Sequence, residues 1–405
     1  MKKTALLTVV LFLSLGLSAQ QEQHEVTVTN IMVPVRVFDG KTFIADLKID
    51  DFEIYENGVL QKTEALYLAN KDHISREEEY KEFAPATNRT FFLIFQLTDY
   101  HPKLEGVIDH FFQNIIVPGD TLSIQTPLKN YSLSPQALKT KSKEVIADEL
   151  KKILRKDITT GSSEYKSLTR DLSRLVRTIQ TSAGVSDLAN TTAAESGDSR
   201  FGIELLLPRY RDSLSKLDDL RVADEKRFLG FAGQLKDREG QKNVLFFYQR
   251  EFRPEIAPNV LNQMQSMYHD NFEVQGAIQE LYMFYNRDQT MNVDRLSQAF
   301  SDSGMTFHFL FLNKEPEYIS GVRMNEQSED VFEALSSAAY ATGGTVDNSH
   351  EPDIAFKNAM NATESYYILY YSPKNYTADG TFKNIEVKLK NKDYKITYRS
   401  GYFAR

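Results

Sequence analysis

The stretch Phe91-Phe92-Leu93-Ile94-Phe95-Gln96-Leu97-Thr98-Asp99 decides the fold class. Its first five residues are all apolar, which is typical of a strand that is covered on both faces. Comparable apolar runs occur at residues 244–247 and 306–312, and helical sequence separates the three runs. Apolar strands that alternate with helices predict a mainly parallel sheet with helices on both faces. The middle of the chain should therefore be an α/β domain.

Antiparallel patterns flank this central region at both ends of the chain. Apolar residues occupy every second position from residue 31 to residue 37, as expected for a half-buried strand. Asn57-Gly58 indicates a hairpin, because both central residues of a type I′ turn need positive φ. Strand patterns return near the C-terminus, at residues 366–371, 385–389 and 394–398.

We therefore expect the α/β domain to be inserted into, or docked against, a β-sandwich-like domain built from the two ends of the chain. An enlarged helical region is expected within the α/β domain, at about residues 161–241. The expected parts are a signal peptide (1–20), an N-terminal β segment (21–70), a charge-rich linker (71–89), the α/β domain (90–372) and a C-terminal β segment (373–405) that pairs with the N-terminal one.

Length and composition restrict the function classes. The chain has 405 residues, enough for about two or three domains with a sizeable core. Its formal net charge of −8 argues against a general nucleic-acid binder, which needs a basic surface. The chain contains no cysteine, so disulfides, thiolate metal sites and cysteine nucleophiles are excluded.

The first twenty residues have the layout of a secretory signal peptide. A basic start at Lys2-Lys3 precedes an apolar run at residues 5–17, and Ser18-Ala19 provides small residues before a polar stretch. The apolar run is shorter than the ~20 residues that a membrane-spanning helix needs, which disfavours the alternative of a retained anchor. We expect an exported protein, periplasmic or extracellular, without an integral membrane segment after cleavage.

Four places in the sequence carry a family resemblance. They are Val33-Pro34-Val35-Arg36-Val37 with residues 51–58, the strand end at residues 95–100, Gly343-Gly344, and Tyr370-Tyr371-Ser372-Pro373 followed by Arg399-Ser400-Gly401-Tyr402-Phe403. Together they resemble bacterial secreted proteins, common in acidobacteria, that carry a von Willebrand factor A-related domain. The resemblance covers nearly all of the mature chain. It implies a Rossmann-like domain used for binding, flanked by β structure, and it does not imply catalysis.

In that family the functional centre is a metal-ion-dependent adhesion site with the motif Asp-x-Ser-x-Ser, a loop Thr and a later Asp. Gln96, Thr98 and Tyr100 stand at the motif positions of this chain, and Gln249 stands at the later Asp. Both carboxylates are thus replaced by amides, which are neutral and cannot offset the charge of a divalent cation. Tyrosine is also too bulky for a small hydroxyl position. We therefore expect no bound metal and no other cofactor.

The same rim of the sheet remains the candidate binding site. Its candidate partner-binding residues are Gln96, Thr98, Asp99, Tyr100, His101, Thr160 and Gln249, with Thr159 as an alternative to Thr160 for the loop position. One interpretation is a hydrogen-bonded polar cap over the sheet edge, since amides and hydroxyls both donate and accept. The other is that the rim binds a protein partner without a metal, because ligands collect at this end of such sheets.

Three functions stay open. The first is a non-enzymatic interaction or adhesion module whose partner is a protein. The second is cation-dependent adhesion with Asp99 and acids such as Glu251 as rebuilt ligands, although alternation along an extended chain makes Asp99 a doubtful substitute. The third is an exported hydrolase, for which no metalloprotease, nucleophile-elbow or phosphate-loop motif occurs. His308 lies within an apolar strand and is expected to be a core histidine, and His101 is expected to start a helix.

Overall fold

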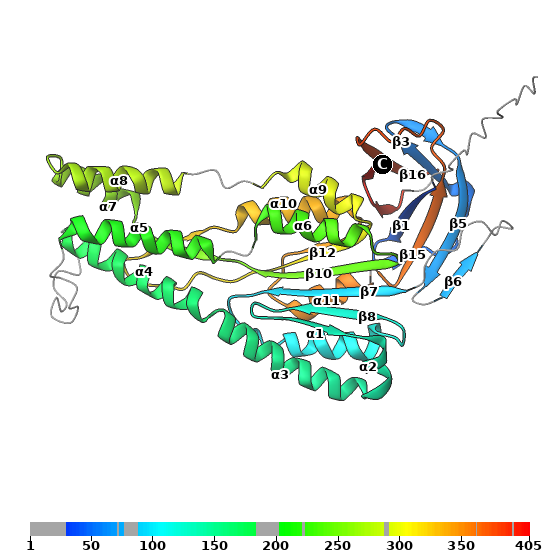
Figure 1. Cartoon of the computed structure of the whole chain (residues 1–405), viewed down its shortest axis with the longest axis horizontal. Coiled ribbons are helices and arrows are strands. Elements are labelled where there is room, and N and C mark those ends of the chain that lie inside the picture. Colours follow the sequence, from blue (N-terminus) through cyan, green and yellow to red (C-terminus); the bar gives the residue numbers. More distant parts are fainter. Residues whose placement is uncertain are drawn as a thin grey trace, which may run out of the picture.

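The structure is a computed structural model that describes residues 30–70, 73–76, 88–183, 202–220, 223–286, 291–361, 363–390 and 393–405. The expected signal peptide lies outside these residues. Figure 1 shows a central sheet between helices, antiparallel sheets at one end and a helical lobe at the other. The chain is therefore an α/β protein. In the part of the chain that is described, no helix is both long and apolar enough to cross a membrane.

The three apolar runs form the three middle strands of the central sheet, as the sequence predicts. Every neighbouring pair in this sheet is parallel except the pair formed by β8 and β9. The strand order reverses between β7 and β10, so these two strands flank a topological switch point. The order across the sheet is β14 (Val346–Asp347), β12 (Met305–Leu312), β10 (Gln241–Gln249), β7 (Arg89–Gln96), β8 (Thr121–Gln125) and β9 (Asn130–Leu133).

Helices cover both faces of the central sheet, and successive residues of β7 pack in opposite directions. Phe91, Leu93 and Phe95 join the core beneath one layer of helices, whereas Phe92 joins the core on the other face. This two-sided burial explains why the strand is continuously apolar. The first layer contains α1 (Leu104–His110), its π-helical continuation η2 (Phe111–Ile115), α2 (Pro135–Thr140), α3 (Lys143–Gly161) and α11 (Pro352–Asn361), and the second contains α6 (Glu225–Lys236), α9 (Val293–Asp302) and α10 (Glu329–Ala341).

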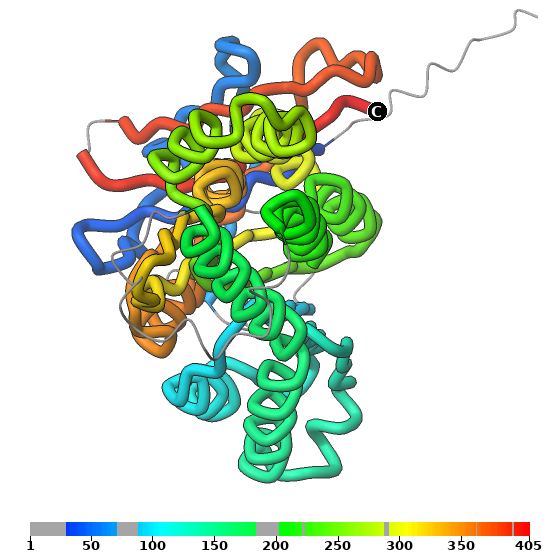
Figure 2. The backbone as a smooth tube through the Cα atoms, turned by 90° about the vertical axis from the view of Figure 1, so that its left-hand side faces the viewer, coloured from blue at the N-terminus to red at the C-terminus, as the bar shows by residue number. Residues whose placement is uncertain are grey.

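The helical lobe lies beyond the carboxyl ends of the central strands and has a hydrophobic core of its own. Helix α4 follows α3 almost without a break and leads from the flank of the sheet into the lobe (Figures 1 and 2). The Tyr165 hydroxyl donates to the carbonyl of Phe252 (3.0 Å), which joins α4 to the small sheet at the base of the lobe. The lobe contains α4 (Ser163–Ser182), α5 (Ile203–Asp219), α7 (Pro258–Met267) and α8 (Phe272–Tyr285), above the two-stranded sheet of β11 (Phe252–Glu255) and β13 (Arg323–Glu326).

The expected bounds of the helical insertion, residues 161–241, need correction. Helix α6 lies within those bounds, but Ala232 and Leu235 pack into the core of the central sheet. Helices α7 and α8 lie beyond residue 241, yet Val260 and Ile278 pack into the core of the lobe. The lobe is therefore assembled from two separate segments of the chain.

Two antiparallel sheets at the other end share one hydrophobic cluster and combine both ends of the chain. Asn57 and Gly58, between β3 and β4, both have positive φ (48° and 80°), so the predicted hairpin turn is confirmed. The first sheet has the order β17 (Lys395–Tyr398), β1 (Ile31–Asp39), β15 (Ser365–Tyr371), β5 (Thr63–Asn70) and β6 (His73–Arg76), with β2 (Thr42–Phe43) beside β1. The second has the order β18 (Gly401–Phe403), β16 (Phe382–Leu389), β3 (Phe52–Glu56) and β4 (Val59–Gln61).

Two expected boundaries are wrong at this end of the molecule. The boundary at residue 372 assigns Ser365–Tyr371 to the α/β domain, but this strand pairs with β1 and β5. Its tyrosines extend the antiparallel sheet rather than the central one. Within the expected linker at residues 71–89, residues 73–76 form strand β6 on β5, and β7 already begins at residue 89.

Candidate functional site

The switch point between β7 and β10 is where a ligand would be expected in an open α/β sheet. Gln96 pairs with Tyr248 in the parallel register, so the two strands end side by side. Thr98 and Asp99 follow β7 directly, and Gln249 is the last residue of β10. The sequence therefore placed these polar groups correctly at one edge of the sheet.

The side chain of Gln249 closes the switch point with three hydrogen bonds. Its Oε1 atom accepts from the backbone N–H of Thr98 (3.0 Å), from the Thr98 hydroxyl (3.0 Å) and from the backbone N–H of Asp99 (2.8 Å). Gln249 is only 8% exposed, and Thr98 is also buried. A carbonyl oxygen has two lone pairs, so three donors leave it no capacity to bind a cation. The amide crosslinks the two strand ends instead.

Asp99 lies between two lysine side chains that come from distant parts of the chain. Lys166 of α4 approaches Oδ1 (2.7 Å), and Lys314, which follows β12, forms an ion pair with Oδ2. Burial acts to raise the pKa of Asp99, but the hydrogen bonds and charges of Lys166 and Lys314 outweigh it and lower the pKa below its usual value. The carboxylate is thus neutralised by the protein's own ammonium groups, which would also repel a divalent cation.

Replacing Lys166 and Lys314 together by Met should raise the pKa of Asp99, because burial would then act without the two opposing ammonium groups. In the native protein the depressed pKa makes these pairs stabilising above the ordinary pKa of Asp, ~3.9, and this contribution is lost as the pH falls through the folded value. An NMR titration of the Asp99 carboxyl carbon measures the change. An unchanged pKa in the double variant would contradict the pairing.

Tyr100 and His101 belong to the beginning of the helix that follows β7. The Tyr100 hydroxyl donates to Glu105 (3.2 Å), and its ring packs against the core beneath α1. Burial, followed by the charge of Glu105, raises the pKa of Tyr100 to about 12. The Nδ1 atom of His101 accepts from the backbone N–H of Lys103 (3.2 Å), so His101 has the helix-start position that the sequence suggested.

The remaining predicted residues are separated from this group. Gln96 is half-buried at the end of β7. Thr159 and Thr160 do not lie in a loop, because α3 continues to Gly161 and the Thr159 hydroxyl donates to the carbonyl of Arg155 (2.7 Å). The assignment of a loop Thr is therefore wrong. Among the described residues, no hydrogen bond joins Gln96 or Thr160 to the Gln249 amide.

Several groups at this rim could not be found from sequence motifs. Lys166 and Lys314 come from α4 and from the segment after β12, and neither lies in a recognisable pattern. Glu251 is buried beside the start of α10, where its backbone N–H donates to Ser328 (3.4 Å). Across the described ranges, no group of three or more His, Asp or Glu side chains is arranged to hold a metal ion.

An open pocket of about 220 Å³ lies next to the switch point. Arg250 crosses it, with an ion pair to Glu326 (2.8 Å) and a hydrogen bond to Asn313 (2.9 Å). Phe311 and Phe332 supply its apolar wall. The rim therefore combines a closed polar seam at Gln249 with an adjacent mixed surface that a partner side chain could enter.

Comparison with known proteins adds no relative. Searches of protein families, curated proteins and solved structures find no match to this chain. The chemistry of the rim therefore has to be read from its own groups. These are a saturated amide, a carboxylate paired with two lysines, and the polar and aromatic side chains of the adjacent pocket.

Proposed function

We propose that this chain is an exported, non-enzymatic protein-interaction module of von Willebrand factor A type that binds its partner without a metal ion. Numbered along the chain, the six central strands lie in the order 3-2-1-4-5-6, which is the order of Rossmann-like sheets. This order supports the family resemblance of the sequence. The β structure made from both chain ends supports it as well.

The observation that carries the metal-free part of the proposal is the position of the Gln249 amide. Its oxygen occupies the switch point and accepts three hydrogen bonds from Thr98 and Asp99. A hard divalent cation needs several oxygen ligands and an excess of negative charge. This rim instead offers one carboxylate, Asp99, that two ammonium groups already neutralise.

The native protein should show no saturable binding of Mg²⁺, Mn²⁺ or Ca²⁺ in isothermal titration calorimetry, because the rim lacks uncompensated anionic ligands. The same absence should appear as an unchanged melting temperature on addition of a chelator. Micromolar binding that is lost on substitution of Asp99 would contradict the proposal and favour cation-dependent adhesion.

A charge-restored variant tests whether electrostatics is the reason. Gln249→Glu keeps an acceptor of the same length, and Lys166→Met with Lys314→Met removes both ammonium groups. We expect the triple variant to gain divalent-cation binding that the single Gln249→Glu variant lacks. If the triple variant also fails to bind, charge is not what excludes the cation.

The interaction itself is tested by affinity capture from envelope extracts with the mature protein as bait. We expect a specific protein to be retained equally with and without chelator. Retention should be lost when Asp99 and Arg250 are replaced by Ala, and it should persist in a control with Lys141→Ala on the exposed side of the sheet domain. Retention that does not depend on the rim would contradict this placement of the binding surface.

A further inference from the structure

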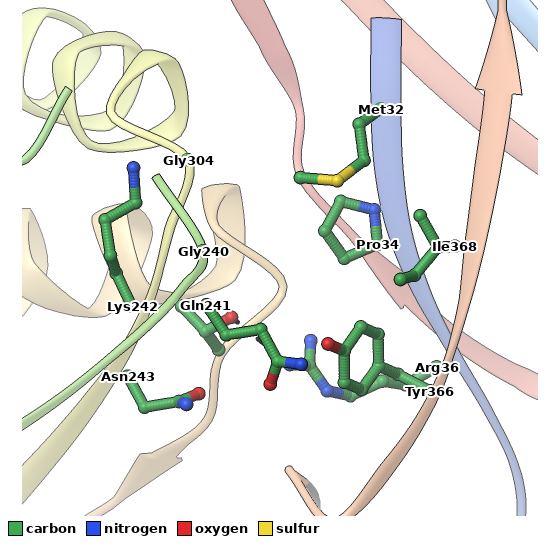
Figure 3. A pocket seen from close by; sticks show the side chains of 11 residues that line it. Met32, Pro34, Arg36, Gly240, Gln241, Lys242, Asn243, Gly304, Tyr366 and Ile368 are labelled. Atoms are coloured by element: carbon green, nitrogen blue, oxygen red, sulfur yellow. Dashed lines mark hydrogen bonds between the residues drawn. The ribbon is translucent and has the colours of Figure 1, made fainter. Parts of the chain in front are cut away.

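A second cavity lies at the opposite end of the central sheet, away from the rim. Here the amino ends of β10 and β12 face the antiparallel sheet that contains β1 and β15. The pocket has a volume of about 70 Å³. Its wall is formed by Met32, Pro34, Arg36, Gly240, Gln241, Lys242, Asn243, Gly304, Thr306, Tyr366 and Ile368 (Figure 3).

Arg36 is the unusual group in this pocket. It is 3% exposed, and its two terminal nitrogens donate to the carbonyl of Gly343 and the hydroxyl of Thr306 (3.2 Å each). Its Nε atom is buried and has no hydrogen-bond partner. Among the described residues, no carboxylate forms an ion pair or hydrogen bond with Arg36. A buried guanidinium without an anion is costly, so the pocket lacks a negative charge that the protein does not supply.

The groups around Arg36 are neutral or positive. Burial, followed by the charge of Arg36, lowers the pKa of His308 to about 3, so this core histidine is neutral at physiological pH. Burial, followed by Arg399 and Arg238, lowers the pKa of Lys242 to about 8. The Lys242 ammonium turns away from Arg36 and donates to three backbone carbonyls, so no acid compensates it either.

The pocket also contains donors that point toward one another. Figure 3 shows the side chain of Gln241 reaching across the pocket toward Arg36 and Tyr366. Tyr366 is 5% exposed, and its buried hydroxyl has no hydrogen-bond partner. Burial raises the pKa of Tyr366, so the hydroxyl keeps its proton and can donate. Met32, Pro34 and Ile368 form an apolar wall beside these groups.

We propose that this pocket binds a small organic carboxylate, with its oxygens accepting hydrogen bonds from Arg36 Nε and the Tyr366 hydroxyl and its short apolar part against Met32, Pro34 and Ile368. The volume of about 70 Å³ exceeds the ~10–15 Å³ that one water molecule needs. Water could satisfy both donors, but only an anion can also offset the charge of Arg36. The apolar wall favours a carboxylate with a short hydrocarbon chain over a fully hydrated inorganic anion.

The test measures binding of sodium butyrate to the full mature protein by calorimetry and by thermal shift, at constant ionic strength set with sodium chloride. We expect saturable binding with a Kd on the order of 1 mM or below, together with a rise in melting temperature. Inorganic phosphate serves as the second probe and should bind more weakly. Binding of phosphate but not butyrate, or of neither, would overturn the proposal.

Variants locate the binding. Tyr366→Phe removes a hydroxyl that has no protein partner, so the fold should be retained while the Kd rises about tenfold or more. Arg36→Met should abolish binding, but it also removes two hydrogen bonds, so Tyr366→Phe is the decisive variant. Tyr370→Phe on the same strand lies outside the pocket and should leave the Kd unchanged. An unchanged butyrate affinity in Tyr366→Phe would overturn the proposal.

Discussion

Replacing Asp120 by Asn should lower the free energy of unfolding by about 3–5 kcal/mol, because it leaves a buried arginine without its anion. Arg89, at the start of β7, donates to Asp120 twice, from Nε (2.9 Å) and from Nη2 (2.6 Å). Both side chains are buried, and Asp120 also accepts from the backbone N–H of Val117 (2.8 Å). The pair thus fixes the start of the first central strand against the turn that precedes β8.

Urea denaturation followed by circular dichroism measures this loss. The matched control is Glu149→Gln, which breaks the exposed pair with Lys141 (3.0 Å) and should cost less than about 1 kcal/mol. The double variant Arg89→Met with Asp120→Leu should recover much of the stability, since it removes both charges. A loss from Asp120→Asn as small as that of the control would show that the pair is not desolvated.

Gly344→Ala should destabilise the protein by about 3 kcal/mol or more, through a collision that no side-chain movement can relieve. A Cβ atom at residue 344 would lie 1.8 Å from the carbonyl oxygen of Phe307 in the central strand β12. The backbone N–H of Gly344 also bonds to the carbonyl of Ala339 (2.9 Å), which holds the residue against the end of α10. Either β12 or this helix end has to move.

The control for Gly344→Ala is Gly276→Ala in the exposed face of α8. No atom lies within 4 Å of a Cβ at Gly276, so this substitution should raise stability by ~0.5–1 kcal/mol through helix propensity alone. Thermal and urea unfolding compare the two variants. Equal effects of the two substitutions would contradict the close approach of Gly344 to β12.

Local patterns predicted the elements of the fold better than their assembly. The apolar run at residues 91–95 and the Asn57-Gly58 turn depend on neighbouring residues, so the sequence displays them directly. Helical periodicity, in contrast, shows that a segment has an apolar face but not which surface covers that face. For this reason α6 was expected in the helical insertion, although it packs on the central sheet.

The candidate site follows the same division. Gln249, Thr98 and Asp99 lie at strand ends, so their proximity follows from the parallel arrangement of β7 and β10. Lys314 is 215 residues away from Asp99 in the chain, and only the folded structure brings the two together. Arg36 likewise bonds to Gly343, 307 residues away, so its burial without an acid is invisible in the sequence.

The pairing of β1 with β15 also dictates the order in which the molecule can be completed. Ile31 lies opposite Tyr371, so a segment made at the start of synthesis has to wait for one made near its end. The central strands and their helices have all emerged from the ribosome by then. Long-range strand pairing is slow and leaves unpaired edges exposed in the meantime. Loss of even the last few residues, which form β18, would leave the final closure unfinished.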